Sequence, residues 1–399
     1  MTKRKVIPFL AFAATVSIFL FFSSATVHRT WNGLPQHIGL GAHIGNSHAH
    51  EVSASGSQQE PDYANWNPRP DFKAGSALPA GHNYTSTLVI ARTKEEDMDW
   101  LQHEIPDQQT AIYVVDDPSA PLHPPKNKGH EVMVYLTYII DHYDNLSDIS
   151  IFTHAHRYAW HNDEYLGSDA ANMISRLSHP RVWREGFVNL RCSWYPGCPD
   201  WMHPGETVQN DFKQEEVLLA KSWSELFPLD KVPSVLAQPC CAQFALSRER
   251  IQAKSHAQYV WYREWLFQTK IPDELSGRIW EYVWQFVFTG ESVLCPSESV
   301  CFCDQYGTCF GGSEEFDDFK SLKNELKDRE KDLRDWENKG KDIEKLEKPE
   351  PGKDRKYRAE IDRLRPIVDR LLSEAEARGK DPKNRAKEAG REWHEGDGF

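Results

Sequence analysis

Short apolar runs alternate with amphipathic segments over residues 86–153. Runs rich in β-branched residues occupy 86–91, 110–115 and 148–153, and each has the length of a strand. Helix-like segments separate them at 95–104 and 131–143; the second carries Val132, Tyr135, Leu136, Ile139 and Ile140 at helical spacing. This alternation is typical of a parallel sheet with crossover helices. It predicts an α/β domain with a mostly parallel sheet over residues 81–313.

The pattern is less regular in the second half of this domain. Helices are expected at 214–226, 258–269 and 274–289, and a strand at 234–246 that Pro239 and two cysteines interrupt. Ser247 is expected to cap a further helix, with Arg250 at the position where a capping box prefers Glu.

An uncharged apolar run occupies residues 6–27, directly after Lys3, Arg4 and Lys5. It has about the 20 residues that span a bilayer, and its basic flank is expected to stay cytosolic. Residues 1–30 are therefore interpreted as a signal anchor, which would make this a type II single-pass protein of the Golgi or ER. Small residues at 23–25 leave a cleaved signal peptide, and hence a secreted protein, as the alternative. Residues 31–80, rich in Gly, Ser and Pro, are expected to be a flexible luminal stem.

Residues 314–399 have a different composition from the rest. Apolar residues are sparse there, and Tyr357, Ile361, Leu364, Val368 and Leu371 follow the spacing of a coiled-coil seam. We expect a charged tail that is helical, coiled-coil or disordered, and that offers a surface to a protein partner.

Charge and cysteine content narrow the class of protein. The net charge is −13, and residues 1–313 carry −11 of it, so the basic footprint of a nucleic-acid-binding protein is missing. All eight cysteines lie between Cys192 and Cys309, which predicts a disulfide framework in an oxidising compartment rather than a zinc site. Cys192 and Cys198 are close enough to suggest a local loop. Sequons at Asn83 and Asn145 indicate a glycoprotein.

Two acidic residues, Asp116 and Asp117, follow the second predicted strand. Ligands of open α/β sheets bind beyond the carboxyl ends of the strands, where such carboxylates hold a ribose hydroxyl or a divalent cation. An ordinary Asp-Pro turn is the other interpretation. With Arg92 and Arg248, these residues form the predicted cofactor-binding set.

Three histidines, His154, His156 and His161, follow the third predicted strand, and Asp163 comes directly after them. Imidazole groups at this spacing suit a metal such as Zn, or acid–base catalysis; structural histidines in hydrogen bonds are the alternative. We expect the histidines to be metal ligands or to flank a diphosphate, and Asp163 or Glu281 to be the catalytic base. The sequence leaves the cofactor undetermined, with Mn or Zn as the candidate metals.

Several segments resemble a fungal family known only as a domain of unknown function. The resemblance runs from about Thr87 to Gly312 and is carried by 129–139, 143–146, 152–156, 160–161 and 240–245. It implies a fold range, and it brings no established activity and no catalytic residues.

At the level of the fold, the chain is also similar to nucleotide-sugar transferases of the GT-A type, which place an acidic turn after an early strand. Here His154 to His156 stand where those enzymes carry Asp-x-Asp. The expected function is a glycosyltransferase-like enzyme acting on a nucleotide sugar and a glycan acceptor. Two alternatives stay open: a histidine-metal hydrolase or oxidase, and a non-catalytic luminal binding or scaffold protein.

Overall fold

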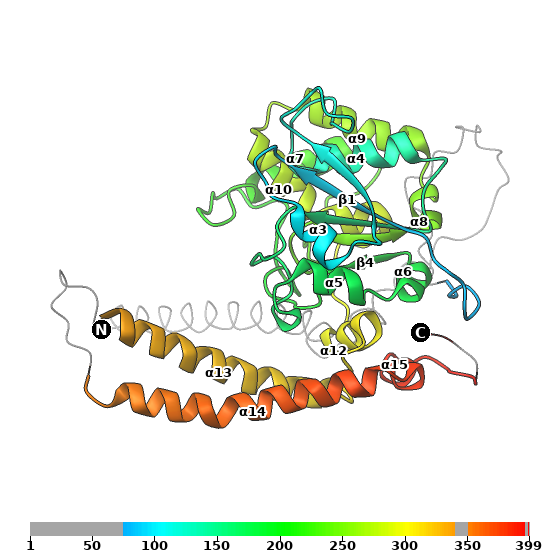
Figure 1. Ribbon diagram of the computed structural model, residues 1–399. Coiled ribbons are helices and arrows are strands. Elements are labelled where there is room, and N and C mark those ends of the chain that lie inside the picture. The colour runs from blue at the N-terminus through cyan, green and yellow to red at the C-terminus, as the bar shows by residue number, and fades with distance from the viewer. Residues whose placement is uncertain (1–74, 340–349, 396–397, 399) are drawn as a thin grey trace, which may run out of the picture.

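Figure 1 presents a computed structural model that describes residues 75–339, 350–395 and 398. The predicted anchor at 6–27 lies outside these residues, as does the predicted stem up to residue 74. Within the described ranges, no helix is both long and apolar enough to cross a bilayer.

The centre of the fold is a five-stranded sheet in the order β2-β1-β3-β5-β4. The strands are β1 (Ser86–Arg92), β2 (Gln109–Val114), β3 (Ile149–His154), β4 (Phe187–Asn189) and β5 (Phe244–Ser247). β1 pairs in parallel with β2 and β3, whereas β5 runs antiparallel to both β3 and β4. The predicted mixed α/β class with a mostly parallel sheet is thus confirmed.

The helices around the sheet are α3 (Asp99–Glu104), α4 (Glu131–His142), α5 (Ala170–Arg176), α6 (His179–Glu185), α7 (Glu216–Leu226), α8 (Arg248–Gln252), α9 (His256–Gln268), α10 (Asp273–Glu281) and α11 (Trp284–Thr289), with the short turn η2 (Glu164–Leu166). Beyond them in the chain come α12 (Glu298–Val300), the short turn η3 (Cys301–Gln305), α13 (Ser313–Lys339), α14 (Lys353–Gly379) and α15 (Pro382–Glu388). The helix expected at 274–289 is divided into α10 and α11.

The prediction of a strand at 234–246 is wrong over most of that range, because only residues 244–247 pair in the sheet. Pro239 lacks a backbone N–H to donate to a neighbouring strand, and Cys241 and Ala242 have positive φ angles of 96° and 50°. The segment before β5 is therefore a tight loop.

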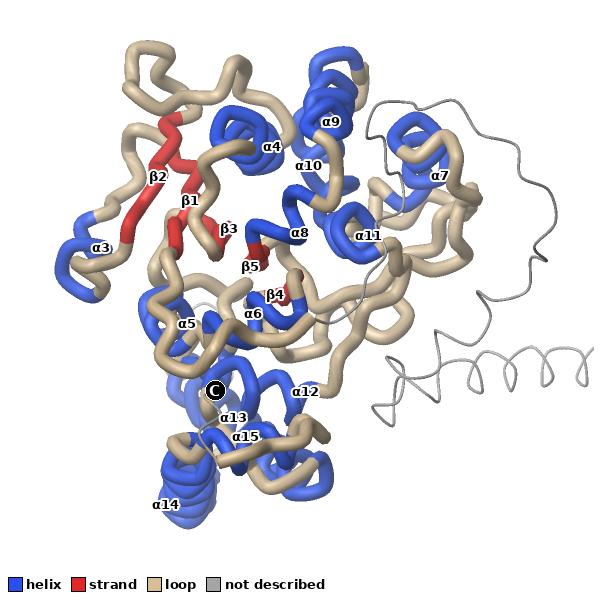
Figure 2. Tube along the Cα trace, turned by 90° about the vertical axis from the view of Figure 1, so that its right-hand side faces the viewer, coloured by secondary structure: helices blue, strands red, loops and turns tan. Residues whose placement is uncertain are grey.

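Helices lie on both faces of the sheet, and each face has its own apolar core. Val89, Phe152 and Phe244 point toward α4, α7, α9, α10 and α11. Leu88, Ile90 and Ile151 point toward α3, α5 and α6 on the other face. Figure 2 shows the sheet between these two layers. The alternation of buried residues within one strand thus produces a three-layer domain.

The charged C-terminal helices pack against this domain. α13 and α14 lie side by side as a hairpin (Figure 1). Phe316 and Phe319 of α13 contact the ring of Tyr165, with centroids 6.0 and 5.8 Å apart. Ile361 and Leu364 of the predicted seam are buried in the same core. The described part of 314–399 therefore covers apolar surface of the domain.

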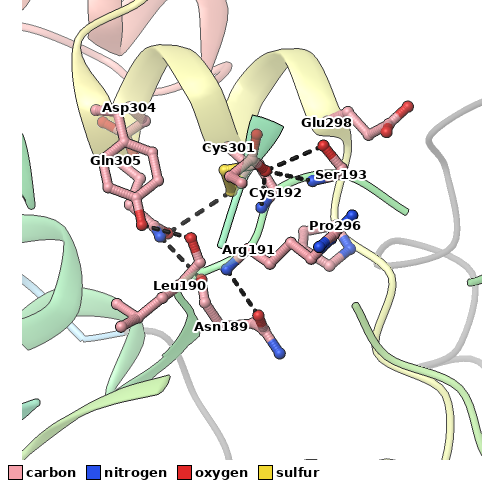
Figure 3. The surroundings of a disulfide bond; sticks show 12 residues. Asn189, Leu190, Arg191, Cys192, Ser193, Pro296, Glu298, Cys301, Asp304 and Gln305 are labelled. Carbon is pink, nitrogen blue, oxygen red and sulfur yellow. Dashed lines mark hydrogen bonds between the residues drawn. A yellow bond between two sulfur atoms is a disulfide. The ribbon is translucent and has the colours of Figure 1, made fainter. Parts of the chain in front are cut away.

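Four disulfides join the eight cysteines: Cys192–Cys301, Cys198–Cys295, Cys240–Cys241 and Cys303–Cys309. The predicted disulfide framework is confirmed. The suggested local loop between Cys192 and Cys198 is wrong, because each pairs with a cysteine about a hundred positions away (separations of 109 and 97). Figure 3 shows the first bond, which ties the segment after β4 to η3.

A buried carboxylate, Asp304, links the domain to the C-terminal helices. It accepts bonds from Arg181 (2.7 Å), Arg184 (2.6 Å) and Arg391 (2.6 Å). Burial alone would raise the pKa of Asp304, but the three guanidinium groups lower it. Because Arg181 and Arg184 belong to α6 and Arg391 follows α15, Asp304 holds the domain and the C-terminal segment together.

The substitution Asp304→Ala is expected to lower the free energy of unfolding by about 3–5 kcal/mol, because it leaves buried arginines without their partner. Urea unfolding of the full chain measures this. Asp318→Ala, on an exposed position of α13, is the matched control and should change stability little. Equal unfolding midpoints for the two variants would contradict the role given to Asp304.

Candidate functional site

The strand order reverses between β1 and β3, since β2 lies on one side of β1 and β3 on the other. In open α/β sheets this switch point, at the carboxyl ends of the strands, is where ligands bind. The loop after β1 touches both neighbouring loops there. The Lys94 N–H donates to Asp116 Oδ1 (2.9 Å), and His156 Nε2 lies 3.5 Å from Glu96 Oε1.

In the acidic turn after β2, the carboxylate of Asp117 lies next to a cation. Asp117 accepts bonds from the backbone N–H and hydroxyl of Ser119 and pairs with Lys94 Nζ at 3.1 Å. These contacts lower the pKa of Asp117 to about 2. Arg92 donates to the carbonyls of Thr93 and Lys94, both at 2.8 Å, and so shapes the loop itself. Of the predicted cofactor-binding residues, Arg92, Asp116 and Asp117 are brought together here.

Two of the predicted histidines, His154 and His161, lie against each other with ring centroids 4.3 Å apart. His154 Nε2 donates to the Cys241 carbonyl at 2.9 Å. Burial lowers the pKa of both rings, that of His161 to about 3, so both are neutral near neutral pH. His161 Nε2 is buried, and no hydrogen-bond partner for it is found within the described residues. His156 is mostly exposed, on the outer side of the loop.

One amide holds the histidine loop in place. Gln243 Oε1 accepts bonds from the Thr153 hydroxyl (2.6 Å) and the His154 N–H (3.2 Å). Its Nε2 donates to Asn162 Oδ1 at 3.0 Å. Because Gln243 directly precedes β5, the pairing of β5 with β3 fixes the positions of His154 and His161.

A disulfide between adjacent residues, Cys240 and Cys241, closes this side of the site. Left-handed backbone at Cys241 and Ala242 accompanies the turn (φ of 96° and 50°). The turn presents the Cys241 carbonyl to His154. Sequence analysis identified the cysteine pair but not its mutual bond.

Two largely buried carboxyl groups lie on helices that pack against each other: Glu131 in the first turn of α4 and Glu281 at the end of α10. Burial is the largest cause that raises the pKa of each, to about 7 for Glu131 and about 8 for Glu281; the partner carboxylate is the next cause for Glu281. The negative charge of Glu281, when it is ionised, acts to raise the pKa of His154, so the two side chains interact electrostatically. Oε1 of Glu131 is buried without a hydrogen-bond partner in the described structure. Such a pair titrates as a unit near neutral pH, as acid–base catalysis needs.

Close helix packing explains how two distant glutamates meet. Gly277 of α10 lies on the backbone before α4, where a Cβ would be 3.2 Å from the Gly129 carbonyl oxygen. Glu281 lies one helical turn after Gly277, on the same face of α10, and Glu131 follows Gly129. Sequence analysis did not single out Glu131. The glycine just before the helix, Gly129, was the one local signal of an unusual turn there. In the structure, Gly129 and His130 both have positive φ angles, of 72° and 53°.

Comparison with known proteins matches residues 88–304, more than half of the chain, to the family described as "Protein of unknown function (DUF3431)". The chain belongs to this family. The DUF3431 region contains β1 from Leu88 on, the other four strands, the histidines and both glutamates, and it ends before α13. No curated protein and no solved structure was found to match the chain.

Two predicted residues of the DUF3431 region lie away from this group. Asp163 is fully buried, and it accepts bonds from the N–H groups of Tyr165, Cys192 and Ser193, each at 3.0 Å. Burial raises its pKa, but these donors show that it anchors the loop. Arg248 pairs with Asp148 at 3.0 Å, at the amino end of β3 and thus at the opposite edge of the sheet.

The structure does not bring His154, His156 and His161 together as one ligand set. Among the described residues, one group of side chains has ligand atoms within 4.8 Å of one another, namely Cys303, Cys309 and Glu388. Its two thiols are already joined in a disulfide. A cation at the sheet edge would therefore depend on Asp116 and Asp117, whose oxygens suit Mn better than Zn.

A second concave feature lies elsewhere in the DUF3431 region. An apolar cavity of about 730 Å³ lies between α7 and α9 and is lined by Leu218, Trp261 and Trp265 among others. The charged pair along it, Lys221 and Glu225, is an exposed contact of 3.8 Å. Since reactive groups gather at the sheet edge, that edge is the candidate functional site.

The coupled carboxyls predict a pH dependence of stability. Their pKa values are raised by folding, so the folded state holds more protons, and unfolding free energy should fall as the pH rises from about 4.5 to about 8. Glu281→Gln should flatten this part of the profile, measured by urea unfolding at several pH values. Glu249→Gln, at an exposed position of α8, is the control. A profile unchanged by Glu281→Gln would contradict the raised pKa.

Proposed function

We propose that this DUF3431 protein is a glycosyltransferase-like enzyme that uses a nucleotide sugar and a glycan acceptor. The observation that carries the proposal is the coupled pair Glu131 and Glu281 at the carboxyl edge of the sheet, beside the switch point. A carboxyl group with a pKa near neutral is suited to take the proton of an attacking hydroxyl.

The proposal includes a GT-A-like sheet, which three features support. The parallel strands β1, β2 and β3 with the crossover helix α4 give the order expected for nucleotide binding. An acidic turn, Asp116–Asp117, follows β2. A segment with the small residue Ala242 leads through β5 into α8, as on the acceptor side of such enzymes.

The roles follow from position and charge. Asp116 and Asp117 would hold the ribose hydroxyls or a cation, and Lys94 and Arg92 would face the diphosphate. The exposed His156 would flank the diphosphate, whereas His154, whose Nε2–H is donated to the Cys241 carbonyl, would line this side of the site. Glu281 would accept the proton of the acceptor hydroxyl while the new glycosidic bond forms. The bond between sugar and diphosphate breaks, and the diphosphate leaves with the electron pair.

A luminal location in the Golgi or ER is part of the same proposal. Four disulfides are typical of an oxidising compartment. Asn83 and Asn145 of the two sequons are both exposed, as glycosylation requires. The type II anchor at residues 6–27 and a partner-binding role for the tail remain predictions.

Thermal shift of the full chain against nucleotide sugars, with and without Mn²⁺, tests donor binding. The full chain is needed because α13 and α14 cover the apolar core. A ligand at a hundredfold excess over its Kd should stabilise the folded state by about 2.7 kcal/mol. If no nucleotide sugar raises the melting temperature of the folded protein, the proposal is overturned.

Transfer activity separates binding from chemistry. Glu281→Gln should keep the nucleotide-induced shift and lower kcat by a factor of about 10² to 10⁴, the contribution of a general base. Glu249→Gln serves as control and should transfer at the normal rate. Full activity of Glu281→Gln, measured by release of the nucleoside diphosphate, would exclude Glu281 as the base.

A further inference from the structure

Two large aromatic side chains stand exposed beside the candidate site. Trp160 has 72% of its surface exposed and Tyr195 has 78%. Exposed aromatic rings next to a reactive group commonly mark a binding surface.

Both rings are carried by backbone that is held firmly. The guanidinium of Arg191, itself buried, donates to the carbonyls of Trp160 (3.0 Å) and Tyr195 (2.9 Å). Arg191 precedes Cys192, whose disulfide to Cys301 fixes this segment (Figure 3). One buried cation therefore sets the two aromatic positions relative to each other.

The loop with Tyr195 is also fastened to the vicinal disulfide. The Cys240 N–H donates to the Pro196 carbonyl at 3.1 Å. At Gly197, with φ of 126°, a Cβ would lie 1.9 Å from the Gln238 carbonyl oxygen, so only glycine allows this approach. Cys240 is partly exposed, so the disulfide adds a rigid, weakly polar surface next to the rings.

A continuous row of side chains connects this surface to the coupled carboxyls. The rings of Trp160 and His161 are 5.8 Å apart, and those of His161 and His154 are 4.3 Å apart. His154 in turn lies in the field of Glu281. The buried, unpartnered Nε2 of His161 is thus between the aromatic pair and the acid–base groups.

We propose that Trp160 and Tyr195 form the platform that binds a pyranose ring of the glycan acceptor. This rests on the proposed function, because the acceptor would extend from the platform past His161 and His154 toward Glu281. A pyranose has an apolar C–H face that stacks on aromatic rings and a rim of hydroxyls that needs polar neighbours. The exposed rings match the first requirement and the partly exposed His161 beside Trp160 matches the second, whereas a protein partner would require a larger apolar patch.

Calorimetric titration of the full chain with neutral hexasaccharides of the cellulose, laminarin, mannan and chitin series tests this directly. At least one should bind to the unmodified protein. Trp160→Ala and Tyr195→Ala should each weaken that binding by a factor of about ten or more, the usual effect of removing a central aromatic contact. Trp261→Ala removes an exposed tryptophan from α9, away from the site, and should bind normally.

If no hexasaccharide binds, or if Trp160→Ala and Tyr195→Ala bind as tightly as the control, the platform is overturned. The nucleotide-sugar thermal shift, measured on the same samples, distinguishes this from failure of the proposed function. A retained nucleotide shift without hexasaccharide binding overturns the platform alone. Hexasaccharide binding that depends on Trp160, without any nucleotide shift, supports the glycan site and overturns the transferase.

Discussion

The antiparallel pairing of β5 with β3 determines what lies at the carboxyl edge of the sheet. Because Phe244 pairs with Phe152, the residues just before β5 meet those just after β3. Gln243 can then bridge Thr153, His154 and Asn162, and the Cys241 carbonyl can hold the His154 ring. A single long-range strand pairing therefore builds the histidine side of the site, and the packing of α10 on the start of α4 builds the carboxyl side.

Burying Glu131 and Glu281 lowers the stability of the fold, and this cost favours a functional role for them. Burial of Glu131, whose Oε1 has no hydrogen-bond partner among the described residues, disfavours its charged form, and the nearby carboxylate of Asp273 disfavours it further. Asp304, also buried, shows the structural solution that this same protein uses elsewhere, with three arginines around one carboxylate. At Glu131 and Glu281, burial outweighs the lowering effect of His130 and Arg278, and the raised pKa values are consistent with groups that exchange a proton.

Local sequence pattern predicted the parallel half of the sheet well. β1, β2 and β3 begin and end within one residue of the expected runs, and α4 within one of its expected range, because burial on both faces leaves a strong apolar signal. The parts that depend on distant contacts were not predictable in the same way. Nothing local indicates that Cys192 bonds to Cys301, that Arg248 reaches the opposite edge, or that Glu131 lies near Glu281. Asp163 is of a residue type suited to acid–base chemistry, yet its carboxylate is used to accept hydrogen bonds from backbone N–H groups.

The central claim is that the pKa values of Glu131 and Glu281 are raised to near neutral pH, so that these carboxyl groups exchange protons there and can act as a base when ionised. Infrared difference spectroscopy of the full chain measures this directly, since a protonated carboxyl has a C=O stretching band that a carboxylate lacks. Between about pH 6 and pH 9, that band should be present at the acidic end and disappear at the basic end, and it should be absent in Glu131→Gln/Glu281→Gln. A spectrum without a protonated carboxyl near pH 6, or a band unchanged in the double variant, would contradict the site as described.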